Sequence, residues 1–138
     1  MKTKAYIDVE VHPNGPAEGD MAVYKGDEWV LLKGAYEDLD VSSNLATWDC
    51  ETGLNKKINT DSNFQLTIEN ITNGMSGHVV ISTTVAGVDI TELDLHAPNY
   101  QITNTQGNGV LTNLKGVYSL CWVYDGSLFS YNIARYAD

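Results

Sequence analysis

The sequence predicts an all-β protein: an antiparallel β-sandwich of the jelly-roll kind, preceded by a small N-terminal arm with one strand and one β-hairpin. Three observations indicate this fold class. Eight to ten short runs alternate apolar and polar residues or are rich in β-branched residues. Turns rich in Gly and Asn separate these runs. Helix content should be very low, with room for a single turn within residues 88–96.

The C-terminal stretch, residues 117–136, is expected to organise the core as a β-hairpin. Asp125-Gly126 lies between two β-rich runs, the pattern of a tight type I′ turn. In the first run, residues 117–124, both faces are largely apolar. This strand should therefore be central in the sheet, or be buried by a neighbouring subunit.

The arm is assigned to residues 1–44. Residues 5–11 alternate as a half-buried strand, and a loop with two prolines follows. Residues 21–33 form a second hairpin that turns at Gly26-Asp27, and a lone hairpin is only marginally stable in water. Residues 34–44 resemble an acidic linker. The apolar residues of the arm should therefore meet the main body or another chain.

The sandwich is assigned to residues 45–138, where acidic residues become fewer and Asn, Thr and Ser more frequent. Its expected strands alternate or are β-branched throughout, as in NFQLTIENI and HVVISTTV. A turn is expected at residues 51–55. The strands before the final hairpin are residues 46–50, 63–71, 78–85, 88–96, 100–103 and 110–114.

Composition narrows the function classes. The net charge of −10 argues against binding to nucleic acid or to an anionic membrane surface. No signal peptide and no run of 18 apolar residues is visible, so we expect synthesis in the cytosol. Cys50 and Cys121 should be free thiols, and Cys121 should be buried and inert within its hydrophobic strand.

Chemistry-bearing motifs are sparse. The spacing of His12, His78 and His96 matches no zinc motif, and no nucleophile elbow or phosphate loop occurs. We therefore predict no enzymatic activity and no cofactor.

Two acidic clusters leave alternatives open. Residues 37–40 and residues 89–94, the latter near His96, could gather oxygen ligands for calcium, although a solvated acidic loop is the simpler interpretation. Two carboxylates brought together by distant strands could also serve a glycosidase.

Exposed aromatic and aliphatic residues of the two hairpins are the candidates for an interface or a binding surface. Trp29 could stack on a sugar ring or a partner protein, or pack within an interface. The candidate residues are Trp29, Val30, Leu32, Trp122, Tyr124 and Tyr131.

From Trp48 onward the chain resembles the β-sandwich modules of tailed-bacteriophage fibre and appendage proteins. The matching segments are TWDCETGLN, SNFQLTIENITNGMSGHVVI, QGNGVLTN and YSLCWVYDGSLFSYNIARY. The segment GDMAVYKGDEWVLL is separately similar to short hairpins of phage fibre chains. Such modules are usually trimers without catalytic residues. The chain has no long shaft, coiled coil or large tip, which favours a small accessory piece.

The resemblance implies a non-enzymatic virion structural protein: a capsid decoration protein, a head-fibre base or a tail or neck adaptor. It also implies a homo-oligomer, expected to be a trimer, whose arm docks on other virion proteins. The alternative is a module that binds carbohydrate or another host-surface group through exposed aromatics and the loops at 73–77 and 104–109. A hydrolase with paired carboxylates is the third hypothesis.

Overall fold

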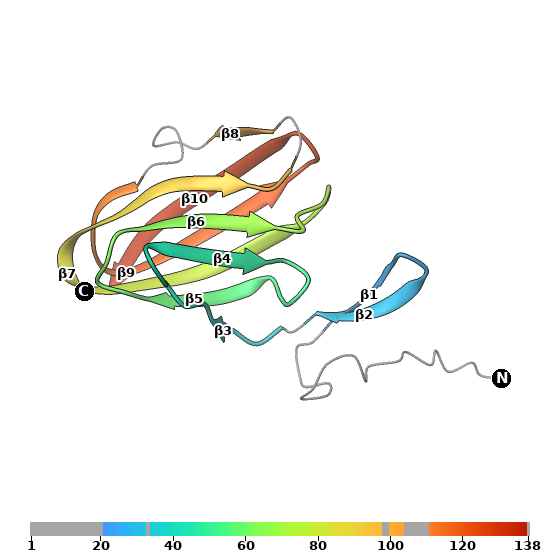
Figure 1. Ribbon diagram of the computed structural model, residues 1–138, viewed down its shortest axis with the longest axis horizontal. Helices are drawn as coiled ribbons and strands as arrows, with labels where there is room; N and C mark the ends of the chain where they lie inside the picture. Colours follow the sequence, from blue (N-terminus) through green and yellow to red (C-terminus); the bar gives the residue numbers. More distant parts are fainter. Residues whose placement is uncertain (1–20, 33, 98–99, 104–110, 138) are drawn as a thin grey trace.

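The computed structural model describes residues 21–32, 34–97, 100–103 and 111–137. All regular secondary structure in these ranges is β-strand (Figure 1). No helix long and apolar enough to cross a membrane occurs in this part of the chain. The strand predicted at residues 5–11 and His12 fall outside the described residues. The strands are β1 (Met21–Lys25), β2 (Glu28–Leu32), β3 (Glu37–Asp38), β4 (Leu45–Asp49), β5 (Asn55–Asn59), β6 (Phe64–Glu69), β7 (Ser76–Leu95), β8 (Gln101–Thr103), β9 (Leu111–Tyr124) and β10 (Leu128–Ala137).

The first part of the main body winds as a short β-solenoid of three coils. β3 and β4 form the first coil, β5 and β6 the second, and the two halves of β7 the third. Like strands of successive coils pair in parallel: β3 with β5 and β5 with β7 in one layer, β4 with β6 and β6 with β7 in the other. β7 therefore belongs to both layers, and it bends at the exposed residues 84–87.

The C-terminal strands close this solenoid from one side. β9 runs antiparallel to both halves of β7, with Val79 opposite Leu120 and Val88 opposite Leu114. β10 pairs antiparallel with β9, and β8 pairs in parallel with the other edge of β10. The longest strands of the molecule thus lie side by side (Figure 1).

This architecture confirms the all-β prediction and corrects the antiparallel jelly-roll sandwich. Among the described strands, parallel pairs link β3, β4, β5, β6 and β7 and also join β8 to β10, whereas β7 with β9, β9 with β10 and β1 with β2 pair in the antiparallel sense. The sequence pattern did not distinguish the two architectures, because inward and outward residues alternate with a period of two in both parallel and antiparallel sheets. Alternation therefore identifies strands without fixing the direction of their neighbours.

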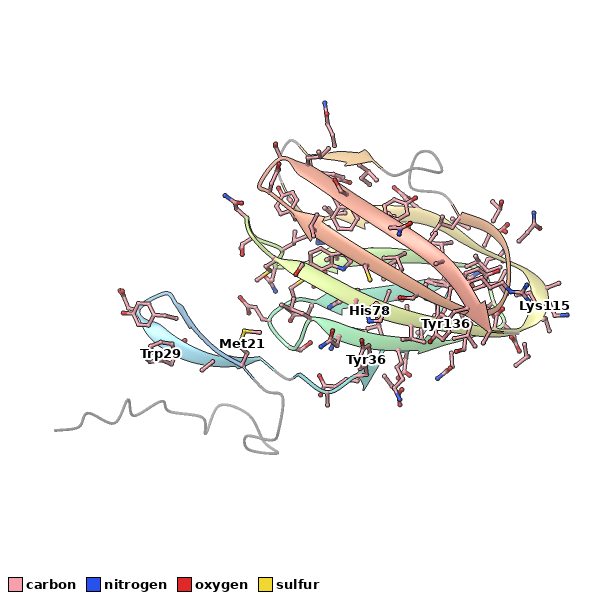
Figure 2. All side chains as sticks on the ribbon, turned by 180° about the vertical axis from the view of Figure 1, so that it is seen from behind. Met21, Trp29, Tyr36, His78, Lys115 and Tyr136 are labelled. Carbon is pink, nitrogen blue, oxygen red and sulfur yellow. The ribbon has the colours of Figure 1, made fainter. Side chains whose placement is uncertain are left out.

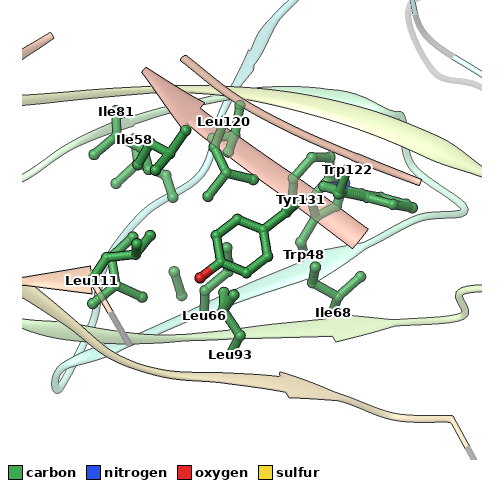
Figure 3. Close-up of a cluster of buried hydrophobic side chains, with 14 of the residues drawn as sticks. Trp48, Ile58, Leu66, Ile68, Ile81, Leu93, Leu111, Leu120, Trp122 and Tyr131 are labelled. Atoms are coloured by element: carbon green, nitrogen blue, oxygen red, sulfur yellow. The ribbon is translucent and has the colours of Figure 1, made fainter. Parts of the chain in front are cut away.

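A single hydrophobic core lies between the two layers (Figure 3). Inward residues of successive coils stack in register, so Leu66 lies between Ala46 and Leu93. The layers meet where the rings of Trp48 and Trp122 pack edge to face, with centroids 5.5 Å apart. Phe129 also stacks on Trp122, with ring centroids 5.4 Å apart. Aromatic contacts between the layers thus tie the final hairpin to the first coil.

The domain boundary predicted between residues 44 and 45 stays a prediction, while the main sheet already includes residues of the expected linker. β3 already pairs with β5, and the Leu39 amide donates to the Lys57 carbonyl at 2.7 Å. The main body therefore begins before residue 45, and part of the expected linker is its first strand.

The N-terminal hairpin stands apart from this body (Figure 1). β1 and β2 pair only with each other, and neither contacts another strand of the described chain. Both turn residues, Gly26 and Asp27, have positive φ, 58° and 66°, the pattern of a type I′ turn.

The final hairpin is confirmed, but its turn differs from the predicted type I′. Only Gly126 has positive φ, and residues 125–127 connect the two strands. The Asp125 carboxylate accepts hydrogen bonds from the amides of Ser127 and Leu128, at 3.0 and 2.7 Å. These bonds hold the pKa of Asp125 below its ordinary value.

Candidate functional site

Ten outward residues of β7, β9 and β10 form a surface without aspartate, glutamate, lysine or arginine, although the exposed Lys115 of β9 and Arg135 of β10 lie on the same strands. Its register follows from the pairing, since His78 lies opposite Cys121 and Cys121 opposite Asn132. Val123 is the most prominent apolar residue, with 55% of its surface exposed. We call this surface the uncharged face; it comprises His78, Val80, Ser82, Val117, Ser119, Cys121, Val123, Ser130, Asn132 and Ala134.

Most charges lie elsewhere. Lys57 of β5 stands at the border of the uncharged face, and Asp125 lies in the turn at its end. The outward surface of the other layer is acidic, because Asp49 of β4 lies opposite Glu69 of β6 and Asp94 of β7 lies opposite Thr67, two residues before Glu69. The chain therefore has one acidic and one uncharged sheet surface.

A hydrogen-bond network crosses the uncharged face (Figure 2). The Tyr36 hydroxyl bonds with Nδ1 of His78, and Nε2 of His78 lies 2.5 Å from the Ser119 hydroxyl oxygen. The rings of Tyr36 and His78 also pack edge to face, with centroids 5.4 Å apart. Desolvation, with smaller contributions from Cys121 and Tyr136, raises the pKa of Tyr36, so this phenol stays protonated at neutral pH.

This network has the order hydroxyl, imidazole, hydroxyl, which invites comparison with a catalytic serine and its base. Ser119 lies in the middle of β9, which is paired on both edges with β7 and β10. The backbone amides around Ser119 therefore serve the sheet and cannot also stabilise an oxyanion. The network is better suited to satisfying polar groups on a packed surface than to acyl transfer.

The prediction that Cys121 is buried is wrong. Its thiol is exposed on the uncharged face, 3.9 Å from the Ser119 hydroxyl oxygen, whereas Cys50 is the fully buried cysteine. The apolar neighbours that suggested burial, Trp122 among them, point to the opposite side of the strand.

A polar hollow of about 600 Å³ lies on the acidic layer. His96 stands at one end of it, with Nδ1 3.5 Å from Oε1 of Glu69 and Nε2 3.5 Å from Oδ2 of Asp94. Thr67 lies at the hollow although only 5% of its surface is exposed, and its hydroxyl accepts a hydrogen bond of 3.2 Å from the Gln65 amide. The remaining lining residues are Ser43, Asn44, Leu45, Thr47 and Thr91.

The acidic clusters considered for calcium are only partly brought together. Asp94 reaches His96, while Asp89 accepts a hydrogen bond from the Asn113 amide at 2.9 Å. Within the described residues no three His, Cys, Asp or Glu side chains form a group that could hold a metal ion. Glu69, which sequence reasoning did not select, joins Asp94 because β6 and β7 pair in parallel.

Of the interface candidates, Trp122, Tyr124 and Tyr131 lie in the core, with 1%, 5% and 4% of their surfaces exposed. They are unavailable to a partner because they point inward from β9 and β10. The outward positions between them, Cys121 and Val123, form the open surface instead.

Trp29 is 41% exposed and packs edge to face on Tyr24, with ring centroids 5.4 Å apart (Figure 2). Val30 and Leu32 belong to β2 by their backbones, while their side chains fall outside what the structure describes. The hairpin thus presents Met21, Tyr24 and Trp29 on its surface.

No protein-family model, curated protein or solved structure matches this chain.

Proposed function

We propose that this chain is a non-enzymatic structural protein of a tailed-bacteriophage virion, a small self-associating appendage or decoration component. The sequence resemblance described above suggests the virion setting. The observation that carries the structural role is the isolated hairpin of β1 and β2, which exposes Tyr24 and Trp29 and contacts no other described strand.

A hairpin of this kind requires a partner. Two strands alone are marginally stable in water, and large exposed aromatics gain free energy when another surface covers them. The hairpin is tethered close to the body, because the Asn55 side-chain amide donates to the Gly34 carbonyl at 2.9 Å and Tyr36 bonds with His78. The hairpin would therefore dock the body at a fixed exit point on another virion protein.

The test is removal of residues 1–32, which leaves Gly34 and Tyr36 in place. The shortened chain should keep its strand content and melting cooperativity but fail to co-sediment with virions assembled in its presence. The double variant Tyr24→Ser with Trp29→Ser should also lose attachment. As a matched control, Val85→Ser changes an exposed apolar residue at the bend of β7 and should attach normally. Attachment by the shortened chain would refute the docking role.

The polar hollow supports a second candidate function, binding of a host-surface carbohydrate. Its lining of hydroxyl, amide and carboxylate groups matches the hydrogen-bonding groups of a neutral sugar. Among the lining residues that the structure describes, Leu45 is the one large apolar residue, 41% exposed, and none is aromatic, so the proposal depends on hydrogen bonds to the sugar and not on ring stacking.

A glycan array with the intact chain tests this second function. Binding that disappears in Gln65→Ala and Asp94→Asn, while thermal stability is retained, would support the hollow as the site. The exposed substitution Asn59→Ala, on the other layer, is the control. An array without bound glycans would leave docking as the sole proposed role.

A further inference from the structure

We infer that the uncharged face is where copies of this chain meet, so that like faces pack against one another around the symmetry axis of a homo-oligomer. The inference deepens the self-association in the proposed function by naming its surface. Three observations carry it: the distribution of charge, the internal hydrogen bonding of the polar groups, and the shape around Val123.

Charge selects this face for self-contact. The chain has a net charge of −10, so most approaches of two copies bring carboxylates together. The layer of β4 and β6 presents Asp49, Glu69 and Asp94 to an approaching copy. The ten residues of the uncharged face include no carboxylate, and contact there therefore avoids like-charge repulsion and the desolvation of carboxylates.

The polar groups at the centre of the face already have partners within the chain. Both ring nitrogens of His78 are occupied, one by the Tyr36 hydroxyl and the other by the Ser119 hydroxyl. A polar group that keeps its hydrogen bonds can be buried at much lower free-energy cost than an unpaired one. This face can therefore lose water without leaving these groups unsatisfied.

The shape of the surface around Val123 suits contact with the same surface of a second copy of the chain. The residue borders two shallow hollows, one of about 270 Å³ shared with Cys121 and Asn132, the other of about 330 Å³ shared with Met75 and Leu128. Both hollows are mainly apolar in their lining. An exposed valine beside apolar hollows is the kind of surface on which self-complementary contacts form.

The first experiment places a charge at the centre of the proposed contact. Wild-type chain at micromolar concentration should sediment as a homo-oligomer, whereas Val123→Asp should sediment as a single folded chain with an unchanged circular dichroism spectrum. Val85→Asp, at a residue 46% exposed on the bend of β7 and away from the face, is the matched control and should remain oligomeric.

The second experiment needs no mutation of the contact and covers the case in which Val123→Asp misfolds. Cys121 is exposed in the single chain, so the proposed contact should slow its reaction with a maleimide. Labelling of the wild type should be several-fold slower at oligomer-forming concentration than after dilution to single chains. Cys50, which is fully buried, should not react in either state, and Cys121→Ser supplies the background.

The outcomes separate this inference from the proposed function. An oligomer that survives Val123→Asp, with Cys121 labelled equally fast at all concentrations, overturns the uncharged face as the contact while self-association stands. A wild-type chain that sediments as a single molecule at every concentration overturns both.

Discussion

The backbone of Gly77 lies against the indole ring of Trp122. A methyl group at this position would come within 2.6 Å of two ring carbons and 2.7 Å of the ring nitrogen. A shift of the indole would disturb its contacts with Trp48 and Phe129, whose ring centroids lie 5.5 and 5.4 Å away. Gly77 thus lets β7 approach the largest side chain of β9 in the core.

Gly77→Ala should therefore lower the free energy of unfolding by about 1–3 kcal/mol, the usual cost of overpacking a well-filled core. Gly77 has no positive φ, so the expected loss is steric and not a backbone effect. Urea unfolding gives the value, and Ser76→Ala at the exposed neighbour is the control. Adding Trp122→Phe should make the double variant less destabilised than the sum of its two parts. Additive losses would contradict the proposed clash.

Asp61 should make stability depend on acid. Its carboxylate accepts hydrogen bonds from the Thr84 amide and hydroxyl, at 2.6 and 2.5 Å, and holds the turn after β5 to the bend of β7. These bonds lower the pKa of Asp61 from its ordinary 3.8. A lowered folded-state pKa contributes stability that is fully present above the ordinary value and lost as pH falls through the folded value. The urea midpoints of wild type and Asp61→Asn should accordingly differ at pH 7 and converge as the pH falls below the ordinary pKa of 3.8 and through the lowered folded-state value. A difference that persists in acid would mean that another property of the carboxylate matters.

Replacing Lys56 by a neutral residue should lower the free energy of unfolding less than neutralising its partner, Glu37. Its ammonium group lies 3.5 Å from Oε1 of Glu37 and donates to the Thr52 hydroxyl at 3.0 Å, with 6% of its side chain exposed. Lys56→Met keeps the packed stem and should change the free energy of unfolding by less than about 1 kcal/mol. Glu37→Gln leaves a buried cation and should cost about 1 kcal/mol, a value reduced because Glu37 is 35% exposed. Thermal melts of the two variants test this prediction, and a larger loss of stability for Lys56→Met than for Glu37→Gln would contradict it.

Leu66 should be among the costliest truncations. The side chain is fully buried and lies in register between Ala46 and Leu93, so no polar group or solvent can fill the space it leaves. Leu66→Ala should lower the free energy of unfolding by about 2–5 kcal/mol. A double-mutant cycle with Leu93→Ala should show coupling, because the two residues stack in adjacent coils. Leu45→Ala, at a residue 41% exposed on the same layer, should cost far less.

The sequence located elements with strong local signals. Gly26-Asp27 and Asp125-Gly126 marked both hairpins, and alternation marked β4, β6 and the two halves of β7. The halves were predicted as two separate strands, residues 78–85 and 88–96, whereas the structure continues through the bend as one strand. Turn chemistry and periodicity depend on neighbouring residues only, which explains their success.

β5 was not predicted, because its own residues carry little local signal for a strand. Its sequence, NKKIN, has one apolar residue, Ile58, and its other inward position is Lys56. The pairing with β3 and β7 makes it a strand, and pairing between distant segments is absent from a local pattern. The parallel coils escaped prediction for the same reason.

One part of the uncharged face was predictable from the sequence and another part was not. The apolar outward side of residues 117–124 indicated an open or covered face, and Val123 is exposed there. The network of Tyr36, His78 and Ser119 was not predictable, since it joins residues 41 and 42 positions apart through the register of β7 and β9. The same holds for His96 with Glu69, which come from adjacent parallel strands.

The continuity of β7 through both layers has a consequence for how the molecule opens. Because this strand supplies hydrogen bonds to β5, β6 and β9, neither layer can separate from the core while the other stays intact. The slowest backbone amides of the two layers should consequently exchange with solvent through one common opening, at a single free energy equal to that of global unfolding. The isolated hairpin of β1 and β2 shares no hydrogen bonds with β7 and should exchange independently.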